Sequence, residues 1–384
     1  MREAAAERAP KGSLRYDPVL LGAVIALAVF GVVMVYSASA VFAGERLRDS
    51  LFFFKRQAAG VGVGLVLLLV VMKIGYRKLE LLATPLLLLA IALLVLVLVP
   101  GLGHAAGGAR RWLRVGPIQF QPSELVKIAL VLWLARSLSK RADRIQIFSV
   151  GMLPHLVVLA LVGALLMAEK DFGSTAVLVL LTFSLLFVAG ARFTYLLAAL
   201  PVALAAGAVL IFTSAYRLDR IKTFLDPWRD PLGKGYQIVE SLLGYGVGGA
   251  FGVGLGASKQ KLFFLPAAHT DFILAIVGEE LGFAGVAAVL VLFALLVWRG
   301  LRASFAAPEG FGCYAALGLT LLFAFEALVN AGMTLSLLPT KGMALPFISY
   351  GMTSAVACCI AAGILLSISG GAGGFLQPAA GGRR

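Results

Sequence analysis

Repeated apolar runs of close to 20 residues dominate this chain of 384 residues. A helix needs about 20 such residues to cross about 30 Å of hydrocarbon. Hydrophobic residues make up 60% of the chain, and the mean hydropathy is +0.97, far above the level of globular domains. Since lipid offers the backbone no hydrogen bonds, the chain is predicted to be an all-α polytopic integral membrane protein.

Glycine, proline and charged residues divide the apolar sequence into ten predicted membrane spans. We expect them at residues 17–41, 57–74, 79–99, 122–137, 149–168, 172–190, 194–215, 269–298, 310–333 and 350–370. Residues 17–370 would form one ten-helix domain, flanked by an N-terminal tail, 1–16, and a C-terminal tail, 371–384. The first apolar run is longer than a signal-peptide core, so we interpret it as a retained helix.

Residues 216–268 form the one long connection, between the seventh and eighth predicted helices. Long loops without structure of their own are uncommon unless they are functional. This loop contains Trp228 and two glycine-rich stretches, so we expect partly ordered structure against the membrane face. Its glycine run, 244–256, lacks the βαβ context of a dinucleotide site. Close backbone approach or a flexible flap explains the run better.

Basic residues are divided almost evenly between the two sides of the predicted membrane domain, and the formal net charge is +14. Charges in short loops slightly favour cytoplasmic tails, which places the long loop outside the cell. The outer basic residues would then include Arg46, Arg48, Lys55, Arg56, Arg110, Arg111, Arg114, Arg217, Arg220, Lys222, Arg229, Lys234, Lys259, Lys261 and Lys341. They could surround a phosphate-bearing ligand or attract anionic lipid headgroups, and charge alone does not separate the two.

Asp271 lies where the basic loop meets the apolar run 272–277, a position at which a carboxylate is costly. Lys259, Lys261 and His269 come shortly before it. Ionisable residues at such depth are rare and usually face a polar cavity, which makes Asp271 a functional candidate. The alternative is an aspartate that caps the N-terminus of a helix.

A second polar cluster begins at Arg111 and Trp112 and continues into a helix start at Pro122. Glu124 and Lys127 follow at i,i+3 spacing, so they share one face of this helix. The pair should point into the bundle, where it could either pin two helices or contact substrate. Trp112 is interpreted as an interfacial anchor rather than a sugar platform.

A third cluster lies in an outer hairpin, residues 337–351, between the last two predicted spans. Its prolines and glycines break the helix at membrane depth, which is tolerated where the backbone is buried in protein or lines a wet cavity. Lys341 could meet a phosphate there or extend to the surface. Glu326, inside the ninth span, needs a partner that the sequence does not identify.

Cysteine and histidine residues predict no disulfide framework and no zinc site. Cys313, Cys358 and Cys359 lie in apolar runs without CxxC spacing, and the three histidines are scattered.

Several motifs between Asp17 and Ser367 together identify a family. They are Met34-Val-Tyr-Ser-Ala-Ser39, Arg111-Trp112, Gln121-Pro-Ser-Glu124 with Lys127, Asp171-Phe-Gly-Ser-Thr175, Leu265-Pro through His269-Thr-Asp271-Phe272, Gly278-Glu-Glu-Leu-Gly282, Pro339-Thr-Lys-Gly342 and Leu345-Pro-Phe-Ile-Ser-Tyr-Gly351. The chain resembles the SEDS proteins of bacterial cell-wall synthesis. The Pro-Thr-Lys-Gly form favours the division branch over the elongation branch. Departures from the usual pattern are Ala267, Glu169-Lys170 and Met352-Thr353.

This resemblance implies a peptidoglycan glycosyltransferase that polymerises lipid II into β-1,4-linked glycan during septal synthesis. The enzyme would lie in the bacterial cytoplasmic membrane with its active site facing outward. The family's essential aspartate falls on Asp271, and its conserved Glu and Lys fall on Glu124 and Lys127. A class B penicillin-binding transpeptidase and other division membrane proteins are the implied partners, and no nucleic acid is expected. No cofactor is required by the resemblance, and a divalent cation, Mg²⁺ or Mn²⁺, is left open.

The chemistry of this reaction agrees with the residues. A sugar C4 hydroxyl needs a base, for which Asp271 is the best-placed candidate. A lipid pyrophosphate leaves as an anion, so positive charge serves it better than a proton. The predicted substrate-binding residues are Glu124, Lys127, Arg111, Trp112, Arg217, Lys259, His269, Thr270, Lys341 and Ser349. Glu279, eight residues beyond Asp271 and about 12 Å along a helix, is too distant for a glycosidase-like pair. We therefore expect inversion at the anomeric carbon.

Two other functions are compatible with the sequence. A flippase or transporter of the same lipid-linked precursor would also use intramembrane charges and broken helices. An inactive scaffold that recruits division proteins is the third interpretation.

Overall fold

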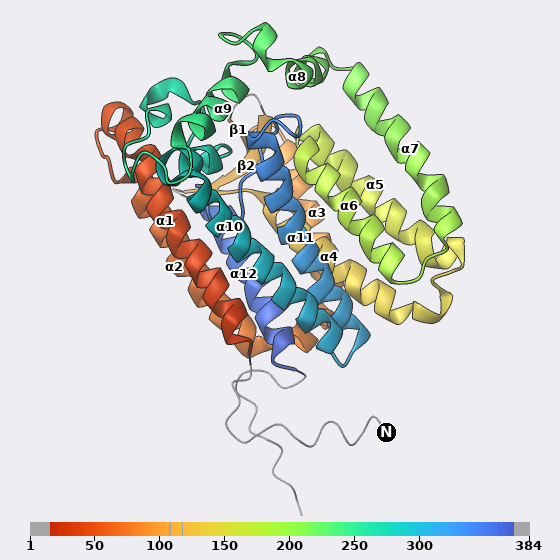
Figure 1. Ribbon diagram of the computed structural model, residues 1–384. Coiled ribbons are helices and arrows are strands. Elements are labelled where there is room, and N and C mark those ends of the chain that lie inside the picture. Colours follow the sequence, from red (N-terminus) through yellow and green to blue (C-terminus); the bar gives the residue numbers. More distant parts are fainter. Residues whose placement is uncertain (1–15, 107–108, 117, 372–384) are drawn as a thin grey trace, which may run out of the picture.

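The computed structural model describes residues 16–106, 109–116 and 118–371. In this part of the chain ten long helices correspond to the ten predicted spans (Figure 1). They are α1 (Pro18–Leu47), α2 (Phe52–Ile74), α3 (Tyr76–Leu98), α4 (Pro122–Lys140), α5 (Leu153–Ala168), α6 (Phe172–Val188), α7 (Phe193–Phe212), α10 (Ile273–Ala306), α11 (Gly310–Thr334) and α12 (Met352–Ser369). Seven described helices are long and apolar enough to cross a membrane, so the polytopic helical fold is confirmed and the count of about ten is approximate.

The first and last described helices meet at one end of the bundle. The backbone amide of Asp17 donates to Ser369 Oγ at 3.1 Å. Asp17 also caps α1, because its carboxylate accepts from the amides of Val19 and Leu20, and Arg299 at the far end of α10 donates to it at 2.5 Å. Helices α8 (Ala215–Leu225) and α9 (Tyr236–Gly248) lie at the opposite end (Figure 1).

A small antiparallel sheet lies between α3 and α4, and the sequence analysis did not predict it. Its strands are β1 (Gly103–Ala106), β2 (Ala109–Val115) and β3 (Ile118–Phe120), in the order β1-β2-β3. β1 and β3 have only four and three residues, and the seven residues of β2 do not alternate strictly between polar and apolar. The sheet leads the chain into α4 and carries Arg111 on β2.

The glycine run of the long loop approaches α10 backbone to backbone, as the sequence suggested. A Cβ added to Gly248 would lie 1.9 Å from the carbonyl oxygen of Gly278. Gly282, at φ 66° and ψ −162°, interrupts α10. After this break, the amide of Phe283 donates to the carbonyl of Gly249 at 2.8 Å, and that of Ala284 donates to the carbonyl of Ala250 at 3.0 Å. In return, the amides of Val253 and Gly254 donate to the carbonyls of Glu279 and Glu280 before the break. The loop therefore supplies hydrogen-bond partners that a continuous helix would have provided internally.

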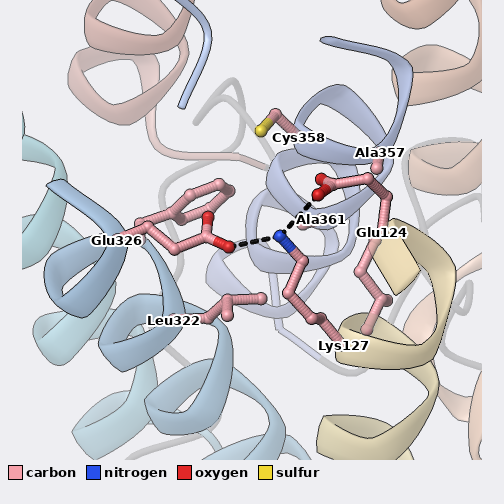
Figure 2. A pocket seen from close by; sticks show the side chains of 9 residues that line it. Glu124, Lys127, Leu322, Glu326, Ala357, Cys358 and Ala361 are labelled. Atoms are coloured by element: carbon pink, nitrogen blue, oxygen red, sulfur yellow. Dashed lines mark hydrogen bonds and ion pairs between the residues drawn. The ribbon is translucent and has the colours of Figure 1, made fainter. Parts of the chain in front are cut away.

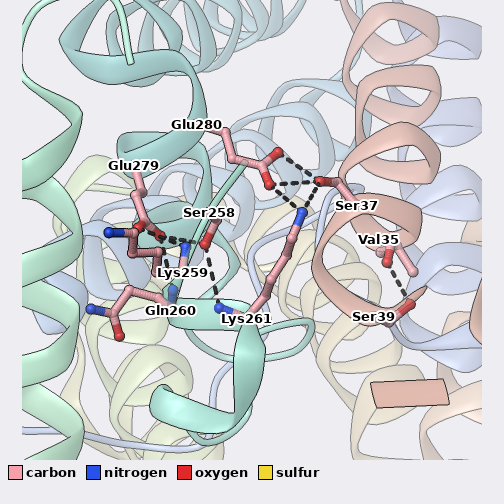
Figure 3. Close-up of polar contacts among 9 residues, drawn as sticks. All are labelled: Val35, Ser37, Ser39, Ser258, Lys259, Gln260, Lys261, Glu279 and Glu280. Carbon is pink, nitrogen blue, oxygen red and sulfur yellow. Dashed lines mark hydrogen bonds and ion pairs between the residues drawn. The ribbon is translucent and has the colours of Figure 1, made fainter. Parts of the chain in front are cut away.

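Two acidic side chains before the break secure the same loop (Figure 3). Glu279 accepts from the Ser258 hydroxyl and from the amides of Lys259 and Gln260. Glu280 accepts from Ser37 on α1 and forms a buried ion pair with Lys261 at 2.8 Å. These contacts give Glu279 and Glu280 a structural role.

We predict that Gly282→Ala destabilises the protein by about 1–3 kcal/mol or more, because its backbone region admits essentially only glycine. The added Cβ would also lie 2.4–2.6 Å from backbone atoms of residues 250–252. The free energy of unfolding, measured by denaturant titration in mixed micelles, tests this. Gly62→Ala on α2 is the control, since nothing lies within 4 Å of its Cβ position. Equal stability of the two variants would contradict the interpretation.

Candidate active site

Asp271 lies in the loop before α10, at the end of the bundle away from the described termini. Helix α10 begins one residue later than a cap at Asp271 would require, because its N-cap is Phe272, without a side-chain cap hydrogen bond. The helix-capping alternative is therefore wrong. Asn330 on α11 donates to the backbone oxygen of Asp271 at 2.9 Å and to that of Met343 at 2.7 Å. This amide joins the Asp271 loop to the hairpin that follows α11.

Two arginines from different segments interact electrostatically with the Asp271 carboxylate. A methyl group on Gly342 would lie 3.4 Å from Asp271 Oδ2 and 3.8 Å from Arg111 Nη1, so Gly342 leaves the space between these groups open. Burial raises the pKa of Asp271 to about 6, while the positive charges of Arg111 and Arg220 oppose the rise. In the described part of the chain no hydrogen bond reaches the carboxylate. It is thus available to a substrate.

Backbone carbonyls at the end of α5 hold Arg111 in place. Its Nε donates to the oxygen of Glu169 at 3.1 Å, and its Nη2 donates to that of Lys170 at 2.6 Å. The Glu169 carboxyl is buried, and neither of its oxygens has a hydrogen-bond partner among the described residues. Burial raises the pKa of Glu169 to about 8, so it is neutral at pH 7. The departure from the family pattern at 169–170 leaves the Arg111 contacts intact because they use the backbone.

Lys341 directly precedes Gly342 in the chain, and its Nζ lies over the ring of Phe172, 4.3 Å from the ring centroid. Asp171, which caps α6 through Ser174, is a further neighbour of this segment. Burial lowers the pKa of Lys341 to about 8, against the opposing effect of Asp171. Arg220 donates to the carbonyl of Thr340 at 2.6 Å, so it supports the same hairpin.

Glu124 and Lys127 point into the bundle, as predicted, and meet a third charged group (Figure 2). Lys127 Nζ lies 2.8 Å from Glu124 Oε1 and also donates to Glu326 on α11. All three side chains are buried. The partner of Glu326 is therefore Lys127. Since Glu326 and Asn330 are four residues apart, about 6 Å of helix separates this cluster from the residue that holds Asp271.

The other predicted substrate-binding residues occupy several places. His269 packs among Phe42, Phe53 and Tyr350, and burial lowers its pKa to about 4, so it is neutral at pH 7. Thr270 Oγ1 donates to the carbonyl of Ala267, and the Ser349 hydroxyl donates to that of Thr270 at 2.6 Å. These contacts shape the loop that carries Asp271.

The remaining predicted residues are Lys259, Trp112 and Arg217, and the described contacts do not join Lys259 or Trp112 to Asp271. The Lys259 side chain is exposed, and Trp112 follows Arg111 on β2, where successive side chains point to opposite faces. Arg217 lies one turn before Arg220 on α8. Their substrate contacts stay predictions. Sequence reasoning placed Arg220 among the outer cations but did not single it out, because the fold of the long loop decides which arginine reaches the site.

The described residues contain no group of three or more His, Cys, Asp or Glu side chains that could hold a metal ion. The divalent cation considered from sequence stays a prediction, since Mg²⁺ is usually held by one or two carboxylates together with phosphates of a substrate.

We predict that Lys127→Met lowers the free energy of unfolding by about 3–5 kcal/mol, because it leaves Glu124 and Glu326 buried without their counter-ion. Denaturant titration in micelles measures the loss. Lys140→Met provides a control on the same helix, where the side chain is exposed and substitution should cost less than about 0.5 kcal/mol. Similar losses for both variants would rule out a stabilising role for the cluster.

The family described as cell cycle protein, comprising FtsW, RodA and SpoVE, matches residues 18–372. A protein of Trichlorobacter lovleyi named probable peptidoglycan glycosyltransferase FtsW is 48% identical over 364 residues, covering 95% of this chain and 96% of that protein. Stage V sporulation protein E of Bacillus subtilis is 40% identical over 353 residues, covering 92% of this chain and 96% of that protein.

Two solved structures share the fold. One, described as structural coordination of polymerization and crosslinking by a peptidoglycan synthase complex, has a TM-score of 0.77 at 31% identity, covering 93% of this chain and 98% of that one. Rod shape determining protein RodA of Thermus thermophilus has a TM-score of 0.68 at 28% identity, covering 92% and 96%. The chain therefore belongs to the SEDS family of FtsW, RodA and SpoVE proteins, and its identity to the Trichlorobacter FtsW exceeds its identity to SpoVE and RodA.

Proposed function

We propose that this protein is a peptidoglycan glycosyltransferase that polymerises lipid II into β-1,4-linked glycan. The observation that carries the proposal is the Asp271 carboxylate, which caps no helix, accepts no hydrogen bond from the described chain and lies beside Arg111 and Arg220. Relatives that carry this activity in their names cover nearly the whole chain. The site suits this class of reaction, because glycosyl transfer from a lipid pyrophosphate needs one base for the hydroxyl and several cations for the leaving group.

Asp271 acts as the general base in this mechanism. Its carboxylate accepts the proton of the attacking C4 hydroxyl while the hydroxyl oxygen bonds to the anomeric carbon of the donor sugar. A pKa of about 6 suits this role, since the group is ionised at neutral pH and still basic enough to accept a proton. Attack from the face opposite the leaving group inverts the anomeric centre.

Arg111, Arg220 and Lys341 stabilise the departing undecaprenyl pyrophosphate. As the bond between the anomeric carbon and the pyrophosphate oxygen breaks, negative charge develops on the leaving group. Fixed cations lower the energy of this charge without delivering a proton. Arg111 and Arg220 are oriented by backbone carbonyls of other segments, so part of the electrostatic environment exists before substrate binds.

The proposed enzyme works at the outer face of the bacterial cytoplasmic membrane at the division septum. In this arrangement the tails, residues 1–16 and 371–384, are cytoplasmic and the loop 216–268 is outside. The start of α1 and the end of α12 lie at one end of the bundle, opposite the Asp271 site, which supports placing the tails and the site on opposite sides of the membrane. A class B penicillin-binding transpeptidase is the proposed partner, supported by the fold shared with a complex that couples polymerisation to crosslinking.

We predict that Asp271→Asn folds and reaches the membrane but loses at least 99% of lipid II polymerisation, because general-base catalysis contributes about 10²–10⁴-fold. Purified protein in detergent with labelled lipid II, analysed by gel, measures this with and without a co-purified transpeptidase. Asp226→Asn, an exposed aspartate of the outer loop, is the matched control and should retain activity.

Several outcomes of this experiment would decide between functions. Glycan formed in detergent without a second compartment excludes a pure flippase. Full activity of Asp271→Asn would refute the assignment of the base. If neither protein polymerises lipid II while Asp271→Asn cells divide normally, the scaffold interpretation holds.

We predict a bell-shaped pH dependence of kcat/KM. Activity should rise with pH through about 6 as Asp271 becomes ionised, and fall through about 8 as Lys341 loses its proton. In Lys341→Arg the alkaline limb should move above pH 9, since a guanidinium stays charged there. An alkaline limb that does not move would assign it to another group, such as Glu169 beside Arg111.

A further inference from the structure

A basic cavity of about 240 Å³ lies far from Asp271, near the end of the bundle at which α1 begins and α12 ends. It is lined by Thr84, Trp133, Arg136, Ser137, Lys140 and Arg141. Apart from Thr84 on α3, these residues recur every three or four positions along α4 and just beyond its end, so they form one helix face. The proposed transfer reaction uses none of them.

Hydrogen bonds hold the two arginines in place around this cavity. Arg136 Nη1 donates to the Leu81 carbonyl and to Thr84 Oγ1, each at 3.3 Å. Arg141 Nη1 donates to Ser137 Oγ at 2.6 Å, and that hydroxyl lies 2.9 Å from Nε2 of the buried His155. The positive groups are therefore oriented before any ligand arrives.

The lining of the cavity carries positive charge only. None of its lining residues is acidic, and in the described part of the chain Arg136, Lys140 and Arg141 form no ion pair. Two other basic residues at this end of the bundle are paired: Arg77 with Glu309, and Arg299 with Asp17. Three grouped cations at the membrane boundary favour an anionic ligand.

We propose that this cavity binds the phosphate of an anionic phospholipid from the leaflet on the side of the described termini. The apolar surface beside the cavity favours a lipid over a free anion. On α3, Leu81 and Leu88 share the face of Thr84 and are 69% and 63% exposed, which provides a path for acyl chains. Trp133, two turns before the end of α4, also lines the cavity, and tryptophan is enriched near membrane interfaces. This proposal does not depend on the glycosyltransferase activity.

Native mass spectrometry of the purified full-length protein tests the proposal, with phosphatidylglycerol and phosphatidylcholine of equal chain length as probes. The wild type should bind one phosphatidylglycerol at least tenfold more tightly than phosphatidylcholine. Arg136→Gln/Arg141→Gln should abolish this preference. Lys73→Gln/Lys78→Gln removes two exposed charges from the same end of the bundle, outside the cavity, and should preserve it.

Inorganic phosphate distinguishes the two sources of the anion. If millimolar phosphate displaces the lipid, the cavity is a site for soluble phosphate and the lipid proposal fails. Equal binding of the two lipids, or equal loss in both double variants, also overturns it.

A measurement on the wild type covers the case in which the double variant does not fold. A photoreactive phosphatidylglycerol should label the peptide that contains residues 133–141. Labelling spread evenly over other helices would reject the site.

Discussion

The surrounding hydrocarbon cannot hydrogen-bond, and this constraint governs how the protein leaves helical geometry. Helix α10 breaks at Gly282, and the glycine run of the long loop supplies the missing backbone partners. The hairpin after α11 enters the bundle in irregular form, and Gln57 bonds the carbonyl of Ser349 and the amide of Gly351. Each departure is matched by a partner from a distant segment. Such close matching explains how non-helical loops can present catalytic groups at the membrane boundary.

The same constraint separates structural charges from chemical ones. Lys127 lies between two buried carboxylates, and Lys261 pairs with Glu280, so the opposite charges in each group neutralise one another. Removing one member would leave an uncompensated buried charge, which is why such clusters hold helices together. Asp271 differs, because cations lie near its carboxylate while no described group donates a hydrogen bond to it. A carboxylate without a hydrogen-bond donor from the protein can accept a proton from a bound substrate.

Local patterns predicted most of the fold, whereas distant pairings decided the details of the site. Each span is a continuous apolar run, so its position follows from residues that are neighbours in sequence. Helix α10 begins at Ile273 rather than at 269, because residues 266–271 turn to meet the hairpin after α11. Lys127 and Glu326 are 199 residues apart, and no periodicity connects them. Arg220 reaches the site through the fold of the long loop, which the sequence alone does not determine.

Asn330 shows how the proposed base and the cations near it keep a common geometry. One side-chain amide bonds the backbone of Asp271 and of Met343, two residues beyond Lys341. One turn away on the same helix, Glu326 ties α11 to α4, which follows the strand segment carrying Arg111. Helix α11 therefore sets the positions of Asp271 and of two cationic segments together. Since preorganised charge stabilises a transition state without reorganisation at the moment of reaction, the proposed mechanism gives the buried charge cluster an indirect part through this shared anchor.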